Sequence, residues 1–176
     1  MRRFFISAAA FLLLFTSGCA SGKIHERSYL RAAVISGNNN DSITMAFFDE
    51  DKTVSADGGD IDAARYNAEL RNGRSVFTGY AELLIVDGKN CCRLLEHMLN
   101  SWKVSPSCMV VYSADGEKLL NEYSPEKLEG IAEQAVKKGV APECDIITVL
   151  GKLSTKRCAE VVELRIDGSA SSRIIY

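Results

Sequence analysis

The sequence has few of the residues on which most catalytic and metal-binding sites depend. Only two histidines, His25 and His97, occur among its 176 residues. It contains no Cys-x-x-Cys pair and no pair of histidines at ligand spacing, so we expect no metal site and no cofactor. Phosphate-binding glycine loops and a Gly-x-Ser-x-Gly motif are also absent. A Ser–His–Asp triad would have to use His97, which we expect to be a half-buried structural residue within a helix.

The chain also lacks an excess of basic residues. It has 21 Lys and Arg against 23 Asp and Glu, for a formal charge of −2. A nucleic-acid partner is therefore not expected, because binding to phosphates requires a positively charged surface. Prolines number only three, and no repeat or low-complexity segment is present. With 47% hydrophobic and 25% charged residues, the composition is typical of a folded globular domain.

The N-terminus has the pattern of a secretory signal. Met1-Arg2-Arg3 is positively charged, and residues 4–15 form a nearly unbroken apolar run. Twelve residues span about 18 Å as a helix, which is too short for a hydrocarbon core of about 30 Å. The segment is therefore interpreted as a signal peptide over residues 1–18 rather than a membrane-spanning helix.

The end of this segment resembles the lipobox of bacterial lipoproteins. Small residues lead into a cysteine in Thr16-Ser17-Gly18-Cys19, although the motif usually has Leu where Thr16 stands. The resemblance implies that Cys19 receives a diacylglyceryl group and becomes the first residue of the mature chain. The alternative is an ordinary cleaved signal followed by an incidental cysteine. Burial of acyl chains contributes about 0.8 kcal/mol per CH₂, so two or more chains give stable anchoring.

Residues 19–28 are predicted to be a polar tether between the lipid and the folded body. His25 lies in this tether, where a solvated side chain is expected. Removal of residues 1–18 takes away two arginines and no acidic residue, so the net charge of the mature chain becomes −4. The acyl group must therefore provide the anchoring, since an acidic body gains no attraction to anionic lipid.

The first part of the body is predicted to contain two strands and a helix. Residues 29–36 and 42–48 are β-rich runs separated by a Gly-Asn-Asn-Asn-Asp turn, and we expect them to form a hairpin. Residues 49–59 are expected to be an acidic loop without the spacing of a calcium-binding loop. A helix over residues 61–72 follows, capped by Asp60 and ended by Gly73.

The remainder alternates strands and helices. Strands are predicted at residues 81–86 and 108–112, with an intervening helix capped by Asn90. The buried stripe of this helix comprises Leu94, Leu95, Met98, Leu99 and Trp102. Residues 81–112 therefore form a predicted βαβ unit. Further predicted elements are a helix opened by Ser124-Pro125-Glu126 and closed by Gly139, a short helix after Pro142, a strand at residues 160–166 and the start of another at Arg173. The expected class is α/β, a mixed β-sheet flanked by helices over residues 29–176. Whether a second domain starts after about residue 155 is left open.

Five cysteines remain beyond the lipobox. Cys91 and Cys92 lie in the first turn of a predicted helix, where partial positive charge can lower the pKa of a thiol. His97 lies five residues after Cys92, about 140° around the helix, so a Cys–His pair is not expected. The other three are Cys108, Cys144 and Cys158. Five cysteines allow at most two disulfides, and the sequence leaves their pairing open.

Several features in order resemble the C subunits of spore nutrient-germinant receptors, the Ger(x)C lipoprotein family. After the lipobox cysteine and the tether come four segments, RAAVISG (31–37), SVFTGYAELLIVDGKN (75–90), LLEHMLNSWKVSP (94–106) and the strand segment CMVVYSADGEKLL (108–120). The resemblance covers the N-terminal part of a typical member. Tyr80 stands where the family typically has His, and Ala20-Ser21 replaces Trp-Asp after the lipid cysteine, which suggests a divergent paralogue.

The resemblance implies a non-enzymatic lipoprotein with the N-terminal α/β domain of this family. It implies anchoring on the outer face of the spore inner membrane and assembly with the membrane-embedded A and B receptor subunits. Two alternatives remain from the residues themselves. One is an extracytoplasmic solute-binding lipoprotein, which would need a concave pocket, and the other is a thiol-active lipoprotein built on Cys91 or Cys92.

Overall fold

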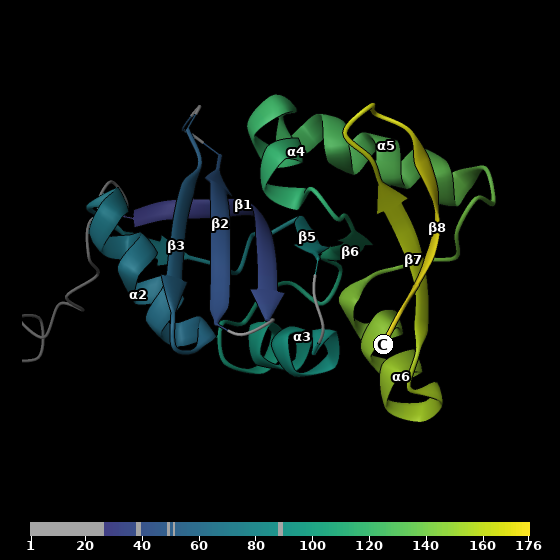
Figure 1. The fold of residues 1–176 in the computed structure, drawn as a ribbon, viewed down its shortest axis with the longest axis horizontal. Coiled ribbons are helices and arrows are strands. Elements are labelled where there is room, and N and C mark those ends of the chain that lie inside the picture. Colours follow the sequence, from purple (N-terminus) through teal and green to yellow (C-terminus); the bar gives the residue numbers. More distant parts are fainter. Residues whose placement is uncertain (1–26, 38–39, 49, 51, 88–89) are drawn as a thin grey trace, which may run out of the picture.

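The computed structural model describes residues 27–37, 40–48, 50, 52–87 and 90–176. Cys19, His25 and the predicted signal peptide lie outside the described residues. The described part is an α/β fold in which a mixed sheet of eight strands is flanked by helices (Figure 1), as the sequence predicts.

The predicted hairpin is present at the start of the sheet. Strand β1 (Arg27–Gly37) pairs antiparallel with β2 (Asp41–Phe47). The expected tether is too long at its C-terminal end, because Arg27 and Ser28 already belong to β1. Ser28 is buried, its hydroxyl donates to Glu50 Oε1 at 2.9 Å, and it accepts from Asn72 Nδ2 at 2.8 Å. These hydrogen bonds fix Ser28 to the folded body.

The prediction of an acidic loop over residues 49–59 is partly wrong. A third strand, β3 (Val54–Gly58), pairs antiparallel with β2 and forms one edge of the sheet. An edge strand needs few buried side chains, and here Ala56 is the buried one. The polar residues around Ala56 hide the strand pattern in the sequence. Ser55 illustrates how they are used, since its hydroxyl lies 2.9 Å from Thr44 Oγ1 across the strand pair.

Helix α2 (Ile61–Asn72) has the predicted bounds and caps. Asp60 Oδ1 accepts a hydrogen bond from the Ala63 amide at 2.8 Å. Gly73 ends the helix in the left-handed region at φ 73°, a conformation that favours glycine. Two side chains of α2 also reach the outer edge of β3, where Asn67 donates to the Asp57 carbonyl at 2.8 Å and Arg71 donates to the Ser55 carbonyl. The helix therefore covers an edge that would otherwise expose backbone groups.

Two strands pair in parallel with β1 along one of its sides. The unpredicted short strand β4 (Ser75–Phe77) pairs with the first three residues of β1, and β5 (Leu83–Val86) pairs with β1 from Ala32 onward. The chain between β4 and β5 thus interrupts what would be one continuous strand. All four residues of β5 are buried, as expected for a central parallel strand covered on both faces.

The predicted βαβ unit is confirmed. It consists of β5, helix α3 (Cys91–Asn100) and β6 (Met109–Tyr112), which is parallel to β5. Asn90 occupies the predicted cap position, but its side chain does not cap the helix. It has φ 65° and its amide donates to the Gly37 carbonyl at 3.0 Å, so it links the start of α3 to the end of β1.

The C-terminal third adds three helices and two strands. The family-like segment at residues 108–120 is not one strand, because β6 ends at Tyr112 and helix α4 (Gly116–Glu122) begins soon after. The other helices, α5 (Pro125–Lys137) and α6 (Ile146–Lys156), are as predicted. Strand β7 (Ala159–Leu164) is parallel to β6, and β8 (Ala170–Ile175) pairs antiparallel with β7. Both belong to the same sheet as β1.

The strand order is β3-β2-β1-β5-β6-β7-β8, with β4 beside the start of β1. Helices α2, α3 and α6 lie along one side of the sheet, and α4 and α5 lie along the other (Figure 1). Gly116 allows α4 to approach the sheet closely, because a Cβ at this position would lie 2.8 Å from Val34 Cγ1. The core is one continuous apolar cluster that spans both sides of the sheet.

The contact between β3 and α2 predicts a large difference between two neighbouring glycines. A Cβ on Gly58 would lie 2.3 Å from the backbone nitrogen of Ala64, whereas a Cβ on Gly59 would meet nothing within 4 Å. We expect Gly58→Ala to lower the free energy of unfolding by about 3 kcal/mol through this overlap with backbone. Gly59→Ala is the matched control and should change it by less than about 0.5 kcal/mol. Equal urea midpoints for the two variants would contradict this packing.

Candidate functional site

The residue with the most specific predicted role, Cys19, lies outside the described residues. Within the ranges described above, none of the helices combines the length and hydrophobicity needed to cross a bilayer. The chemistry-bearing residues that the structure does describe are the cysteines, His97 and a set of acidic side chains.

Cys91 and Cys92 do not form an activated thiol pair. Cys91 is 1% exposed, and its burial together with the nearby Asp87 carboxylate raises the pKa of its thiol to about 11. Partial burial also raises the pKa of Cys92, and the carboxylate of Glu96, 3.7 Å from its sulfur, raises it further. The start of α3 therefore does not stabilise a thiolate at either position. Cys91 is instead a small buried residue of the apolar core.

The environments of the three later cysteines are also those of structural residues rather than of a reactive site. Cys108 and Cys144 are buried, and burial raises the pKa of both thiols. Cys158 is half-buried, and none of these three forms a disulfide.

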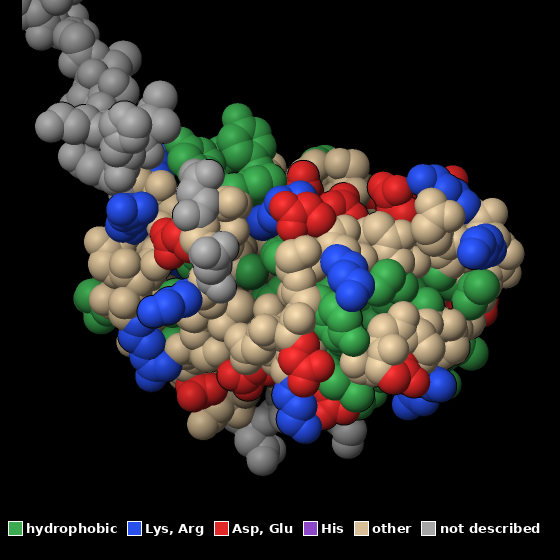
Figure 2. All heavy atoms as spheres, turned by 90° about the horizontal axis from the view of Figure 1, so that it is seen from above, with side chains coloured by type: hydrophobic (Ala, Val, Ile, Leu, Met, Phe, Trp, Pro, Cys, Tyr) green, Lys and Arg blue, Asp and Glu red, His purple; other side chains and the backbone are tan. Residues whose placement is uncertain are grey.

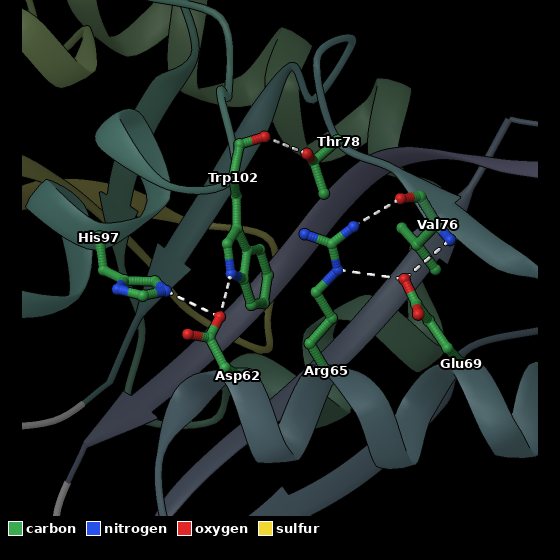
Figure 3. A network of polar contacts seen from close by, with 7 residues as sticks. All are labelled: Asp62, Arg65, Glu69, Val76, Thr78, His97 and Trp102. Atoms are coloured by element: carbon green, nitrogen blue, oxygen red, sulfur yellow. Dashed lines mark hydrogen bonds and ion pairs between the residues drawn. The ribbon is translucent and has the colours of Figure 1, made fainter.

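His97 takes part in a polar network between α2 and the end of α3 (Figure 3). Its Nε2 lies 2.8 Å from Asp62 Oδ1, and the same oxygen accepts the indole N–H of Trp102 at 2.8 Å. The Trp102 hydrogen bond first, and the His97 contact second, lower the pKa of the Asp62 carboxyl. His97 is half-buried and packs edge-on against Trp102, which matches the structural role expected for it.

The same network supports the outer edge of β4 (Figure 3). Arg65 Nη2 donates to the Val76 carbonyl at 2.8 Å, and Glu69 Oε1 accepts from the Val76 amide at 3.0 Å. The two side chains are themselves paired at 3.1 Å, and the Arg65 guanidinium lies 4.9 Å from the centre of the Trp102 ring. Arg65 and Glu69 thus satisfy the backbone groups that a neighbouring strand would otherwise bind. The regular helical spacing of Arg65 and Glu69 is visible in the sequence, but the edge that they bind is not.

The described acidic residues in and just after the predicted loop do not converge on a cation. No group of histidine, cysteine or acidic side chains among the described residues could hold a metal ion. Asp60 caps α2, Asp62 binds Trp102 and His97, and Glu50 accepts from Ser28. Each of these carboxylates has a structural partner.

An aromatic cluster at the start of the sheet is the most distinctive surface feature. The Tyr29 ring stacks on Tyr80 at 5.9 Å and lies 5.7 Å from Phe77, and Phe77 meets Tyr80 edge-on at 5.2 Å. We call these three residues the aromatic cluster. It forms because β1 and β4 place Tyr29 and Phe77 side by side, while the interruption before β5 places Tyr80 over them. The sequence does not predict the cluster, and its only signal for it is the Thr78-Gly79 break in a β-rich run with an aromatic residue on either side.

A small cavity lies between the end of β2 and the start of α5. Its volume is about 270 Å³, and its lining includes Arg31, Phe48, Lys52, Tyr123 and Glu126. The Arg31 guanidinium lies over the Phe48 ring at 4.8 Å, donates to Glu82 at 2.9 Å and is also paired with Glu126. The cavity is smaller than typical ligand pockets, which start at about 300 Å³ and are mostly apolar. Because its arginine already has partners, this cavity offers little support for the solute-binding alternative. A larger and more open hollow of about 460 Å³ lies along α5, and its lining includes Lys127, Ile131 and Val140.

Comparison with known proteins identifies no relative of the chain. No family model matches the chain, and neither a curated protein nor a solved structure matches it. The function must therefore be argued from its own residues.

The raised pKa of Cys91 predicts a slow thiol. At pH 7.5 a thiol of pKa about 11 holds about a hundredfold less thiolate than one at the ordinary value of 9.0. We expect iodoacetamide to alkylate Cys91 in the folded chain at least about a hundredfold more slowly than in the same chain unfolded in urea. Peptide mass spectrometry over a time course measures both rates. Equal or faster alkylation of the folded chain would favour the thiol-active alternative.

Proposed function

We propose that the chain is a non-enzymatic lipoprotein that is held on the outer face of a membrane through Cys19 and acts by assembly with other proteins. The observation that carries this proposal is the N-terminal pattern, in which two arginines, a short apolar run and Thr16-Ser17-Gly18 lead directly into the cysteine. The run is long enough for a signal peptide and too short to remain as a membrane span.

The position of the first strand supports a closely tethered body. β1 begins at Arg27, only eight residues after Cys19. The body that follows has its own continuous core, so it does not need the membrane to bury its apolar residues. A folded module on a short lipidated tether is the arrangement that a surface-anchored assembly protein requires.

The internal chemistry supports a role in assembly rather than in catalysis. The thiols of Cys91 and Cys92 have raised pKa values, and the carboxylate of Asp62 holds His97 and Trp102 together. These groups bind elements of the fold to one another. A catalytic site would instead bring such groups to a cleft with a free nucleophile or base.

The proposed partners are the membrane-embedded A and B subunits of a spore germinant receptor. This part of the proposal rests on the resemblance of residues 31–37, 75–90, 94–106 and 108–120 to the Ger(x)C family, since no family model matches the chain. The outer face of the spore inner membrane is the corresponding location.

Substitution of the lipobox cysteine tests the anchor. We expect Cys19→Ala to lose all fatty-acid label in cells fed an alkyne fatty acid, and to be released or kept as the uncleaved precursor. Cys92→Ala is the matched control, because it removes a half-buried thiol elsewhere in the chain and should keep the full label. Label retained in Cys19→Ala would contradict the anchor, and so would loss of the label in both variants.

Purification from spore membranes tests the partners. A tag after Tyr176 should be tolerated, because this residue is exposed at the end of the described chain. We expect the tagged protein, extracted in mild detergent, to bring down the multi-spanning A and B subunits in amounts comparable to its own. Recovery of the protein alone from membranes that contain both subunits would refute receptor assembly while leaving the lipid anchor intact.

A further inference from the structure

We propose that the aromatic cluster of Tyr29, Phe77 and Tyr80 is a second membrane contact, which rests in the headgroup region of the bilayer that holds Cys19. The inference builds on the proposed lipid anchor and adds the surface of the folded body that faces the lipid.

The length of the tether limits where the cluster can lie. Cys19 and Arg27 are eight residues apart, and an extended chain covers at most about 3.6 Å per residue, or about 29 Å in all. Tyr29 follows only two residues later, and the parallel register of β1 and β4 sets Phe77 beside it. Arg27 therefore lies at most about 29 Å from Cys19, and the cluster lies at the same end of β1.

The chemistry of the cluster suits the interface between water and lipid. Tyr80 is 61% exposed although it is in contact with two other rings. Tyrosine combines an apolar ring with a polar hydroxyl and is enriched at both interfaces of a membrane. Figure 2 shows exposed hydrophobic side chains gathered at the edge of the molecule where the described chain begins. Tyr29 and Phe77 are half-buried, so Tyr80 supplies most of the exposed ring surface of the cluster.

The cluster is also held rigidly by the fold. The Thr78 hydroxyl donates to the Trp102 carbonyl, which ties the interruption between β4 and β5 to the end of α3. Gly79 lets the chain turn against the Phe77 ring, because a Cβ there would lie only 2.9 Å from Phe77 Cζ. A rigid aromatic surface loses little conformational freedom when it enters the headgroup region, so more of its burial energy is available for binding.

Two arginines at the same end complement the aromatic rings. Arg27 is exposed and pairs in register with Ser75, the residue that follows the exposed Arg74. The Arg74 guanidinium has a long contact of 3.7 Å with Glu50. Long basic side chains beside an apolar surface can extend toward lipid phosphates. Arg27 and Arg74 therefore place cations at this end of the chain, while Glu82 and Glu129 line a hollow together with Tyr80.

Quenching by brominated lipids tests the contact in the full lipidated chain. The probe is a vesicle of phosphatidylcholine and phosphatidylglycerol with bromine in the upper part of the acyl chains. Tyr80→Trp places a reporter in the cluster and keeps an aromatic ring there. Tyr176→Trp is the matched control, because Tyr176 is 75% exposed and follows β8, four strands from β1 or about 19 Å at the usual spacing. The parent chain provides the baseline from Trp102, which is 3% exposed.

We expect the brominated lipid to remove about half of the added emission in Tyr80→Trp, because an interfacial ring lies at the headgroup boundary. The emission added in Tyr176→Trp should be unchanged. Mass spectrometry of the N-terminal peptide from the same sample reports whether Cys19 carries its lipid. Equal quenching of the two variants in an acylated chain overturns the membrane contact alone and leaves the cluster as a surface for a protein. An unmodified Cys19 overturns the lipid anchor and this inference together.

Discussion

The pairing of β1 on both of its sides is the constraint on which the rest of the structure depends. β1 binds β2 along one side, and along the other it binds first β4 and then β5. Its central residues, from Ala32 to Ile35, are all buried, so they fix the register of the hairpin and of the βαβ unit together. Because a shift of one residue would move every side chain to the opposite face, this strand determines which residues reach the surface at its start. The same strand directly follows the predicted tether, so the residues at its start are the described residues nearest in the chain to Cys19.

The break between β4 and β5, which both pair with β1, produces the aromatic cluster. The same break leaves an edge of β4 that the polar network of α2 binds. A single strand from β4 through β5 would place Tyr80 in the ladder, whereas the break places it over Tyr29 and Phe77. The short β4 is then left without a strand on its outer side, and Arg65 and Glu69 bind its Val76 backbone instead. The Trp102 ring under Arg65 and the Asp62 hydrogen bonds join this support to α3. Polar side chains that could suggest catalysis are thus explained by the geometry of one broken strand.

Sequence patterns predict the elements that are amphipathic or strongly capped. Asp60 and Gly73 mark both ends of α2, and Ser124-Pro125 marks the start of α5, because caps act within a few residues. The missed elements are those that depend on distant partners. β3 has one buried residue, β4 has three residues in all, and α4 is seven residues long with a glycine at its start. Asn90 is a further example, since its side chain donates to the Gly37 carbonyl at the end of β1 and does not cap its own helix. The aromatic cluster could not be predicted for this reason, because it joins residues 29, 77 and 80 through strand register.

The polar side chains of this fold lie both between its elements and beyond the carboxyl ends of its strands. Enzymes of the α/β class gather charged and nucleophilic groups beyond the carboxyl ends of parallel strands, and this fold has Asp87 after β5 and a hollow lined by Asp115 and Arg165 after β6 and β7. Here the polar interactions of Asp62, Arg65 and Glu69 tie α2 to neighbouring elements, and Cys91 has become part of the core. The distinctive side chains that remain exposed are apolar or aromatic, and a group of them lies close in sequence to the predicted lipid. On the proposed anchor at Cys19, the aromatic cluster is an exposed surface near the lipid in the chain, because Tyr29 follows only ten residues later.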